Sequence, residues 1–107
     1  MNDSYIFSYV TVESLEQAEL IAKKLIEDKL AACVNVIPKV SSYYEWQGKV
    51  CKDEELILLI KSLEPLFEEI KKTILSLHSY ELPSILKLPC LGGHKDYLKW
   101  LKEQVSN

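Results

Sequence analysis

Two histidines and three cysteines are the side chains of this sequence best suited to bind a soft metal ion or to act as nucleophiles. His78 lies in the polar segment HSYELP, after an apolar helical pattern, where an imidazole nitrogen would be accessible. No second ligand stands at a spacing that is diagnostic of a metal site. We predict a divalent cation, copper or another, at His78; the alternative is a loop histidine that is hydrogen-bonded to a neighbour.

The cysteines raise the possibility of nucleophilic catalysis. A thiol with His78 or His94 as its base would suit acyl transfer. Cys33 stands in the apolar run LAACVNVI and is predicted to be a small core residue, whereas Cys51 and Cys90 are predicted to meet solvent. The sequence has no nucleophile elbow, no glycine-rich phosphate loop and no paired carboxylate motif, so we predict that the protein is not an enzyme.

Three aromatic residues crowd against a glycine in the stretch SSYYEWQGKV. They are Tyr43, Tyr44 and Trp46, and the Gln47-Gly48 pair follows them directly. This pair predicts a hairpin turn, because glycine accepts the positive φ that tight hairpins need. Aromatic side chains next to a turn are expected to be exposed in an isolated chain, which points to a partner surface.

Composition and charge narrow the class of protein. A chain of 107 residues with 48% hydrophobic content is enough for one domain, residues 1–107, with a single core. The net charge is −3 and the lysines alternate with glutamates, so no basic stripe is present and nucleic acid is not an expected partner. We see neither a signal-peptide pattern nor a long apolar segment, and therefore expect no membrane association and a cytoplasmic location.

Apolar spacing predicts the elements that must position these residues. In chain order they are a strand at 5–12, a helix from Leu15 to about Lys29, strands at 30–46 and 49–61, a helix with Pro65 in its first turn, a strand at 84–89 and a helix after Gly93. Ser14 and Gln17 have the spacing of a capping box, and Pro38 predicts a bulge or an edge position. The order βαββαβ plus a C-terminal helix predicts an α+β, ferredoxin-like fold with an antiparallel sheet.

The predicted hairpin is longer than a compact domain of this size. Residues 30–46 would reach about 50 Å at about 3.3 Å per residue, whereas such a domain is roughly 35 Å across. The two helices therefore cannot cover its far end, where Tyr43, Tyr44 and Trp46 lie. We predict that these residues form an interface with other copies of the same chain.

Five segments together resemble one known family, in order and over nearly the whole chain. They are LAACVNVIP (30–38), SYYEWQGKV (42–50), ELILLIKS (55–62), HSYELPSILKLP (78–89) and YLKWL (97–101), and they resemble the CutA family of divalent-cation tolerance proteins. The resemblance implies a homotrimer similar to the PII signalling proteins, in which long hairpins between the second and third strands join the subunits. It also implies a role in tolerance of copper and other divalent metals, without an established catalytic reaction.

The resemblance also bears on the site residues. In bacterial members credited with copper binding, a cysteine and a further histidine occupy the positions of Val10 and Leu77, so His78 is what this chain keeps of that ligand set. A second hypothesis is a PII-like signalling module. In it, Lys61, Tyr80 and Glu81 would meet in clefts between subunits and bind a small molecule.

Overall fold

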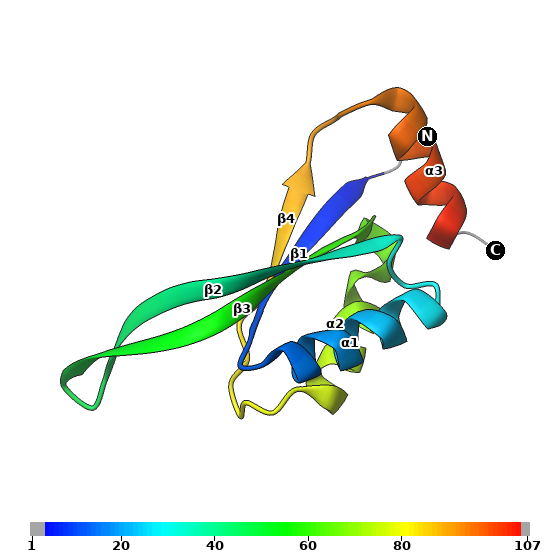
Figure 1. Ribbon diagram of the computed structural model, residues 1–107. Coiled ribbons are helices and arrows are strands. Elements are labelled where there is room, and N and C mark those ends of the chain that lie inside the picture. The colour runs from blue at the N-terminus through cyan, green and yellow to red at the C-terminus, as the bar shows by residue number, and fades with distance from the viewer. Residues whose placement is uncertain (1–3, 106–107) are drawn as a thin grey trace.

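Residues 4–105 are described by a computed structural model, in which four strands form one antiparallel sheet with helices packed against it (Figure 1). The elements are β1 (Tyr5–Val12), α1 (Leu15–Glu27), β2 (Cys33–Trp46), β3 (Lys49–Leu63), the short 3₁₀ turn η1 (Glu64–Leu66), α2 (Phe67–Leu77), β4 (Ile85–Cys90) and α3 (Lys95–Val105). The strands lie in the order β2-β3-β1-β4, and each neighbouring pair is antiparallel. The predicted α+β, ferredoxin-like fold is therefore confirmed.

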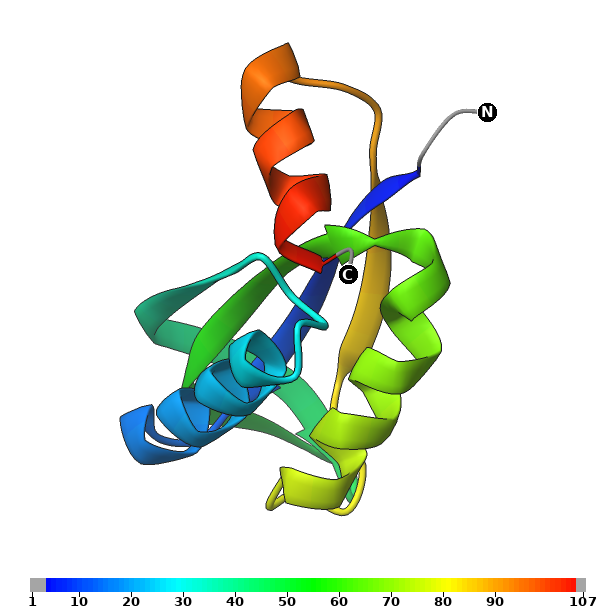
Figure 2. The same cartoon turned by 90° about the vertical axis from the view of Figure 1, so that its right-hand side faces the viewer.

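The hydrophobic core lies between one face of the sheet and helices α1 and α2. Along β1, half-buried and buried residues alternate, because successive strand side chains point to opposite faces. Val10 of β1 and Leu58 of β3 are register partners, and both are fully buried in the cluster that holds Ile21 of α1 and Ile74 of α2. Figure 2 shows the two helices side by side on this face.

The other face of the sheet, called the second face below, is not covered by α1 and α2. Register places Tyr9 of β1 beside Leu59 of β3 and Leu86 of β4 on this face. Leu86 is 56% exposed, and Tyr9 and Leu59 are half-buried. The second face therefore presents an apolar surface in the single chain.

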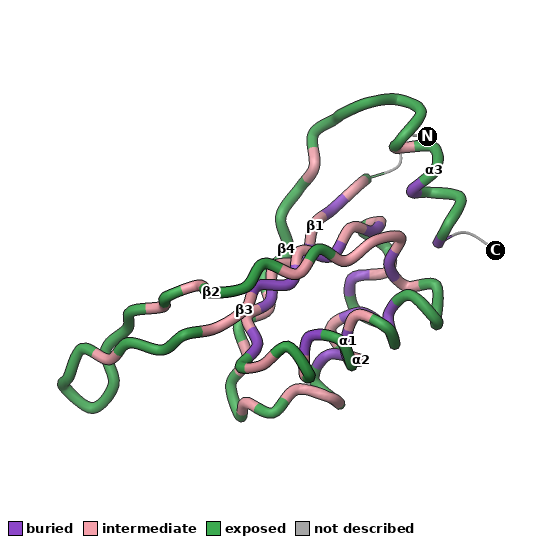
Figure 3. The backbone as a smooth tube through the Cα atoms, in the orientation of Figure 1, coloured by how far each residue is buried: buried purple, intermediate pink, exposed green. Residues whose placement is uncertain are grey.

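Strands β2 and β3 continue well beyond the helices as a long hairpin. The molecule measures 48 × 25 × 22 Å, and Figure 1 shows the hairpin projecting away from α1 and α2. Figure 3 shows that its far end is mostly exposed, and Tyr43 and Trp46 are 68% and 62% exposed. The prediction that the hairpin extends beyond the part of the domain covered by the two helices is confirmed.

Two local features shape the hairpin, and the sequence predicted both. Gln47 and Gly48 have φ values of 50° and 79°, as in the two-residue turns whose twist matches that of paired strands. A register shift interrupts the pairing of β2 with β3 at Pro38 and Lys39, where proline has no N–H to donate. Lys39 has φ of 60° at this bulge.

Some predicted boundaries were wrong by a few residues. The second strand begins at Cys33 instead of Leu30, because the chain first closes the end of α1: the N–H groups of Leu30 and Ala31 both donate to the Leu25 carbonyl, at 2.9 and 3.2 Å. Pro65 lies in the turn η1 and not in the first turn of α2. No helix within residues 4–105 is both long and apolar enough to cross a membrane.

Candidate functional site

His78 lies directly after α2, and backbone groups hold both of its ring nitrogens. Nε2 lies 2.8 Å from the carbonyl oxygen of Thr11 on β1, and the N–H of Tyr80 donates to Nδ1 at 3.0 Å. Since a carbonyl can only accept, Nε2 must carry the proton and Nδ1 must be the bare acceptor. Both bonds match the Nε2–H tautomer of His78, whose ring lies half-buried between the end of α2 and β1.

Tyr80 connects this segment to the hairpin. Its hydroxyl donates to Glu55 Oε2 on β3 at 2.7 Å, and its ring packs on the His78 imidazole with 4.7 Å between ring centroids. Burial and the hydrogen bond to the Glu55 carboxylate, together with its negative charge, raise the pKa of the Tyr80 hydroxyl well above its usual range. Tyr80 thus remains a neutral donor to Glu55 at physiological pH.

Gln17 anchors the same segment from the side of α1. Its amide nitrogen donates to the carbonyl of Leu77 at 2.8 Å, and its amide oxygen accepts from the N–H of Ser79 at 2.9 Å. The predicted capping box is only half correct: the Gln17 N–H bonds Ser14 Oγ, but the Gln17 side chain caps the end of α2. Sequence reasoning placed Gln17 at a helix start but could not find this distant partner.

The predicted cleft residues do not meet within one chain. Tyr80 lies next to Glu81, which is exposed, whereas Lys61 lies on the second face between Phe7 and Cys33. Its ammonium is 3.4 Å from the Tyr97 hydroxyl of α3. Lys61 lies six positions along β3 from Glu55, the partner of Tyr80, which is roughly 20 Å at about 3.3 Å per residue.

The prediction for Cys33 was wrong, because it is half-buried and lies outside the core cluster. Val34 and Val36 pack against the core, so Cys33 points to the second face beside Lys61. Cys51 and Cys90 are also half-buried. The three thiols lie on separate strands or strand ends and do not form a cluster.

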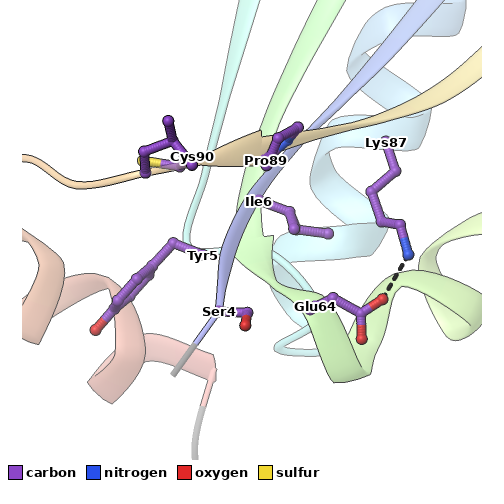
Figure 4. A pocket seen from close by; sticks show the side chains of 8 residues that line it. Ser4, Tyr5, Ile6, Glu64, Lys87, Pro89 and Cys90 are labelled. Atoms are coloured by element: carbon purple, nitrogen blue, oxygen red, sulfur yellow. Dashed lines mark hydrogen bonds and ion pairs between the residues drawn. The ribbon is translucent and has the colours of Figure 1, made fainter. Parts of the chain in front are cut away.

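A surface cavity of about 380 Å³ lies between the start of β1, the end of β4 and η1. In Figure 4 Lys87 points toward Glu64 across this cavity, and the two form an ion pair. Cys90 lines the cavity and its thiol donates to the Gly92 carbonyl at 3.4 Å. The charges at this cavity are paired with each other, and none of the predicted site residues lines it.

These residues do not fit a closed metal site in a single chain. Within residues 4–105, no group of three or more His, Cys, Asp or Glu side chains is placed to hold a metal ion. His78 offers a lone pair at Nδ1 only if the Tyr80 N–H leaves it. A cation at His78 would therefore bind Nδ1 in competition with the hydrogen bond from the Tyr80 N–H.

Comparisons with known proteins agree on one family. Residues 6–104 match the family described as CutA1 divalent ion tolerance protein. The Thermus thermophilus protein named divalent-cation tolerance protein CutA is 47% identical over 96 residues, which are 90% of this chain and 93% of that protein. The Arabidopsis thaliana protein named CutA, chloroplastic, is 41% identical over 95% of this chain, which spans only 56% of that longer protein.

Solved structures give the same answer. The crystal structure of CutA1 from Oryza sativa superimposes with a TM-score of 0.93 at 39% identity, over 97% of this chain and 95% of that one. The match includes the long hairpin, since so little of either chain is left out. On sequence and structure together, this chain belongs to the CutA1 divalent ion tolerance protein family.

Proposed function

We propose that this protein serves divalent-cation tolerance as a homotrimer that binds a divalent cation, copper or another, weakly at His78. Its main support is the family match over residues 6–104. Imidazole nitrogen suits copper in either oxidation state, and the half-buried ring of His78 lies near the surface after α2. No group of three or more ligating side chains is found in residues 4–105, which explains why the expected binding is weak.

Titration of copper and of zinc into the assembled protein tests the cation site. We expect the His78→Ala variant to lose most of the binding seen with the wild-type protein. His94→Ala is the matched control, because His94 is exposed and precedes α3, away from the 78–80 segment. Equal binding by the wild-type and His78→Ala proteins would contradict His78 as the ligand.

The trimer is supported by two apolar surfaces that the single chain leaves open. The far end of the hairpin carries Tyr43, Tyr44 and Trp46, and the second face carries Leu86 and Leu88. Exposed apolar patches of this kind mark protein interfaces, and closed symmetric rings bury them most economically. Sedimentation and light scattering should find a trimer; a folded monomer at micromolar concentration would contradict it.

A PII-like module that binds a small molecule between subunits is the second candidate function. Lys61 supports it, because none of the ion pairs found in residues 4–105 involves this half-buried lysine. Such an ammonium suits an anionic ligand, to which Tyr80 and Glu81 of a neighbouring subunit would add hydrogen bonds. Thermal-shift screening with nucleotides and metabolites tests it: no stabilisation at millimolar ligand would remove its support.

The non-enzymatic role and the cytoplasmic location are also part of this proposal. The family names carry no reaction, and the Arabidopsis thaliana relative is named as chloroplastic, so each organism needs its own answer. Fractionation of the source cells with an antibody to this chain tests the location. Recovery with the membranes or outside the cytoplasm would contradict it.

A further inference from the structure

The segment from Leu77 to Tyr80 is tied to three different elements by hydrogen bonds. Gln17 ties it to α1, His78 ties it to β1 through Thr11, and Tyr80 ties it to β3 through Glu55. The two last bonds are joined, because the N–H of Tyr80 donates to His78 Nδ1. One continuous chain of bonds therefore runs from the β1 backbone through the imidazole to the base of the hairpin.

Glu55 marks the point where the hairpin leaves the body of the domain. It is the register partner of Val40, the first residue of β2 after the bulge, and β1 pairs with β3 only from Leu56 onward. Beyond this point β3 has β2 as its one strand neighbour within residues 4–105. The Tyr80 hydroxyl is thus a side-chain tie between the 78–80 segment and the hairpin base.

We propose that His78 is a positioning residue that couples the occupancy of its Nδ1 atom to the Tyr80–Glu55 bond at the hairpin base. Any ligand that takes the Nδ1 lone pair must displace the Tyr80 N–H, because that lone pair is the only one at this atom. Displacement moves the Tyr80 backbone and also removes the ring packing between the two residues. The Tyr80 hydroxyl then leaves Glu55, and the hairpin base loses its hydrogen bond to the 78–80 segment.

The statement that a cation can occupy Nδ1 rests on the proposed function, whereas the coupling of His78 to the Tyr80–Glu55 bond does not. If a cation binds at Nδ1, then binding and the Tyr80–Glu55 bond oppose each other. By thermodynamic reciprocity, removing that bond must favour the cation by the same factor. Since the Glu55 carboxylate is a charged acceptor, we expect a factor of about three to ten.

The first test uses the metal-free protein and two substitutions that divide the functions of the imidazole. His78→Asn retains an acceptor near the Nδ1 position, and His78→Gln retains a donor that reaches the Nε2 position. Hydrogen exchange is followed at Tyr80 and in the peptide that spans residues 51–57, with β1 as the reporter of global unfolding. We expect exchange at both places to rise at least about tenfold in His78→Gln and to change less than about twofold in His78→Asn.

A separate variant keeps the test valid where a His78 substitution fails to fold. Tyr80→Phe removes the hydroxyl but leaves the backbone N–H on His78, so it should loosen residues 51–57 without exposing the Tyr80 amide. Unchanged exchange of residues 51–57 in both Tyr80→Phe and His78→Gln would overturn the coupling. Equal effects of His78→Gln and His78→Asn would also overturn it, because Nδ1 would then have no special role.

The second test adds zinc alone to the wild-type protein, to His78→Ala and to Tyr80→Phe. We expect Tyr80→Phe to bind zinc about three- to tenfold more tightly than wild type, and zinc to speed exchange in residues 51–57 of wild type. Zinc binding that needs His78 but leaves this peptide unchanged would overturn the coupling and leave the proposed function standing. Equal zinc binding by wild type and His78→Ala would overturn both the proposed function and the claim that a cation binds at Nδ1. The coupling between His78, Tyr80 and Glu55 would then be tested by hydrogen exchange in the metal-free variants alone.

Discussion

At the scale of single residues, two buried serines on the sheet face toward the helices occupy contrasting environments. Ser62 of β3 donates its hydroxyl to the Leu30 carbonyl. Ser8 of β1 is equally buried, at 0% exposure, but its hydroxyl has no hydrogen-bond partner among the described residues. A buried hydroxyl without a partner loses its hydration and gains nothing in exchange.

Ser8→Ala should therefore stabilise the fold. We expect the free energy of unfolding to rise by about 1 kcal/mol, because the substitution removes the unpaired hydroxyl and leaves almost no cavity. Ser62→Ala is the matched control and should lower the same quantity by about 1 kcal/mol through the loss of a satisfied bond. Guanidinium denaturation at one protein concentration measures both; a destabilised Ser8→Ala would contradict an unpaired hydroxyl at Ser8.

Tyr44 gives a prediction for alkaline pH. Its hydroxyl donates to Asp53 Oδ2 at 2.6 Å, and this bond, together with desolvation and the charge of Asp53, raises the pKa of Tyr44 to about 12. The folded state thus favours the neutral phenol, while the unfolded chain ionises near pH 10. The stability from this bond is fully present below pH 10 and is lost as the pH rises through about 12.

Absorbance of the tyrosinate at 295 nm checks this prediction during a titration at alkaline pH. The wild-type protein should show a step near pH 12 that loses the amplitude of one phenol in Tyr44→Phe, while the later ionisation of Tyr80 remains. Asp53→Asn should move the Tyr44 step to lower pH. Tyr43→Phe removes a phenol from the neighbouring position and serves as the control. An unchanged amplitude near pH 12 in Tyr44→Phe would contradict the assignment of this step to Tyr44.

At the scale of elements, the sequence pattern predicted the helices and strands, which depend on residues close together in the chain. It missed side-chain contacts between residues far apart in the chain. Helical spacing of apolar residues predicted a helix after Pro65, and Phe67, Ile70 and Ile74, which stand at that spacing, form the buried face of α2. The prediction for Cys33 was wrong because the face to which a strand side chain points depends on where the strand begins. Strand β2 begins only after the backbone of Leu30 and Ala31 has bonded the end of α1. The role of Gln17 was missed because its partners lie 60 and 62 residues away.

The hairpin turn offers a clean test of an element. Gly48 has φ of 79°, and a Cβ atom there would meet no other atom within 4 Å, so Gly48→Ala changes the backbone energy alone. We expect it to lower the free energy of unfolding by about 1 kcal/mol. Gly92→Ala is the matched control, since its φ is not positive and its Cβ would also meet nothing. Equal effects of the two substitutions on thermal unfolding would contradict this account.

At the scale of the whole molecule, the exposed hairpin end should matter most for assembly. Trp46 is 62% exposed in the single chain and lies far from His78, so Trp46→Ala removes interface area without touching the cation site. We expect the variant trimer to dissociate at a lower temperature than the wild-type trimer and to need a higher protein concentration to assemble. Zinc binding should be nearly unchanged. Light scattering during heating measures it. A variant trimer as heat-resistant as wild type would show that Trp46 is not an interface residue.

The position of β1 in the centre of the sheet also determines the order in which the chain can fold. Tyr5 pairs with Leu63 of β3 on one side and with Cys90 of β4 on the other, so the first strand must wait for most of the chain. The β2–β3 hairpin closes through a two-residue turn and can form early, because its contacts are local. During synthesis, β1 can pair with β3 first, but its edge toward β4 stays open until β4 has left the ribosome, and in that interval this chain is most open to aggregation.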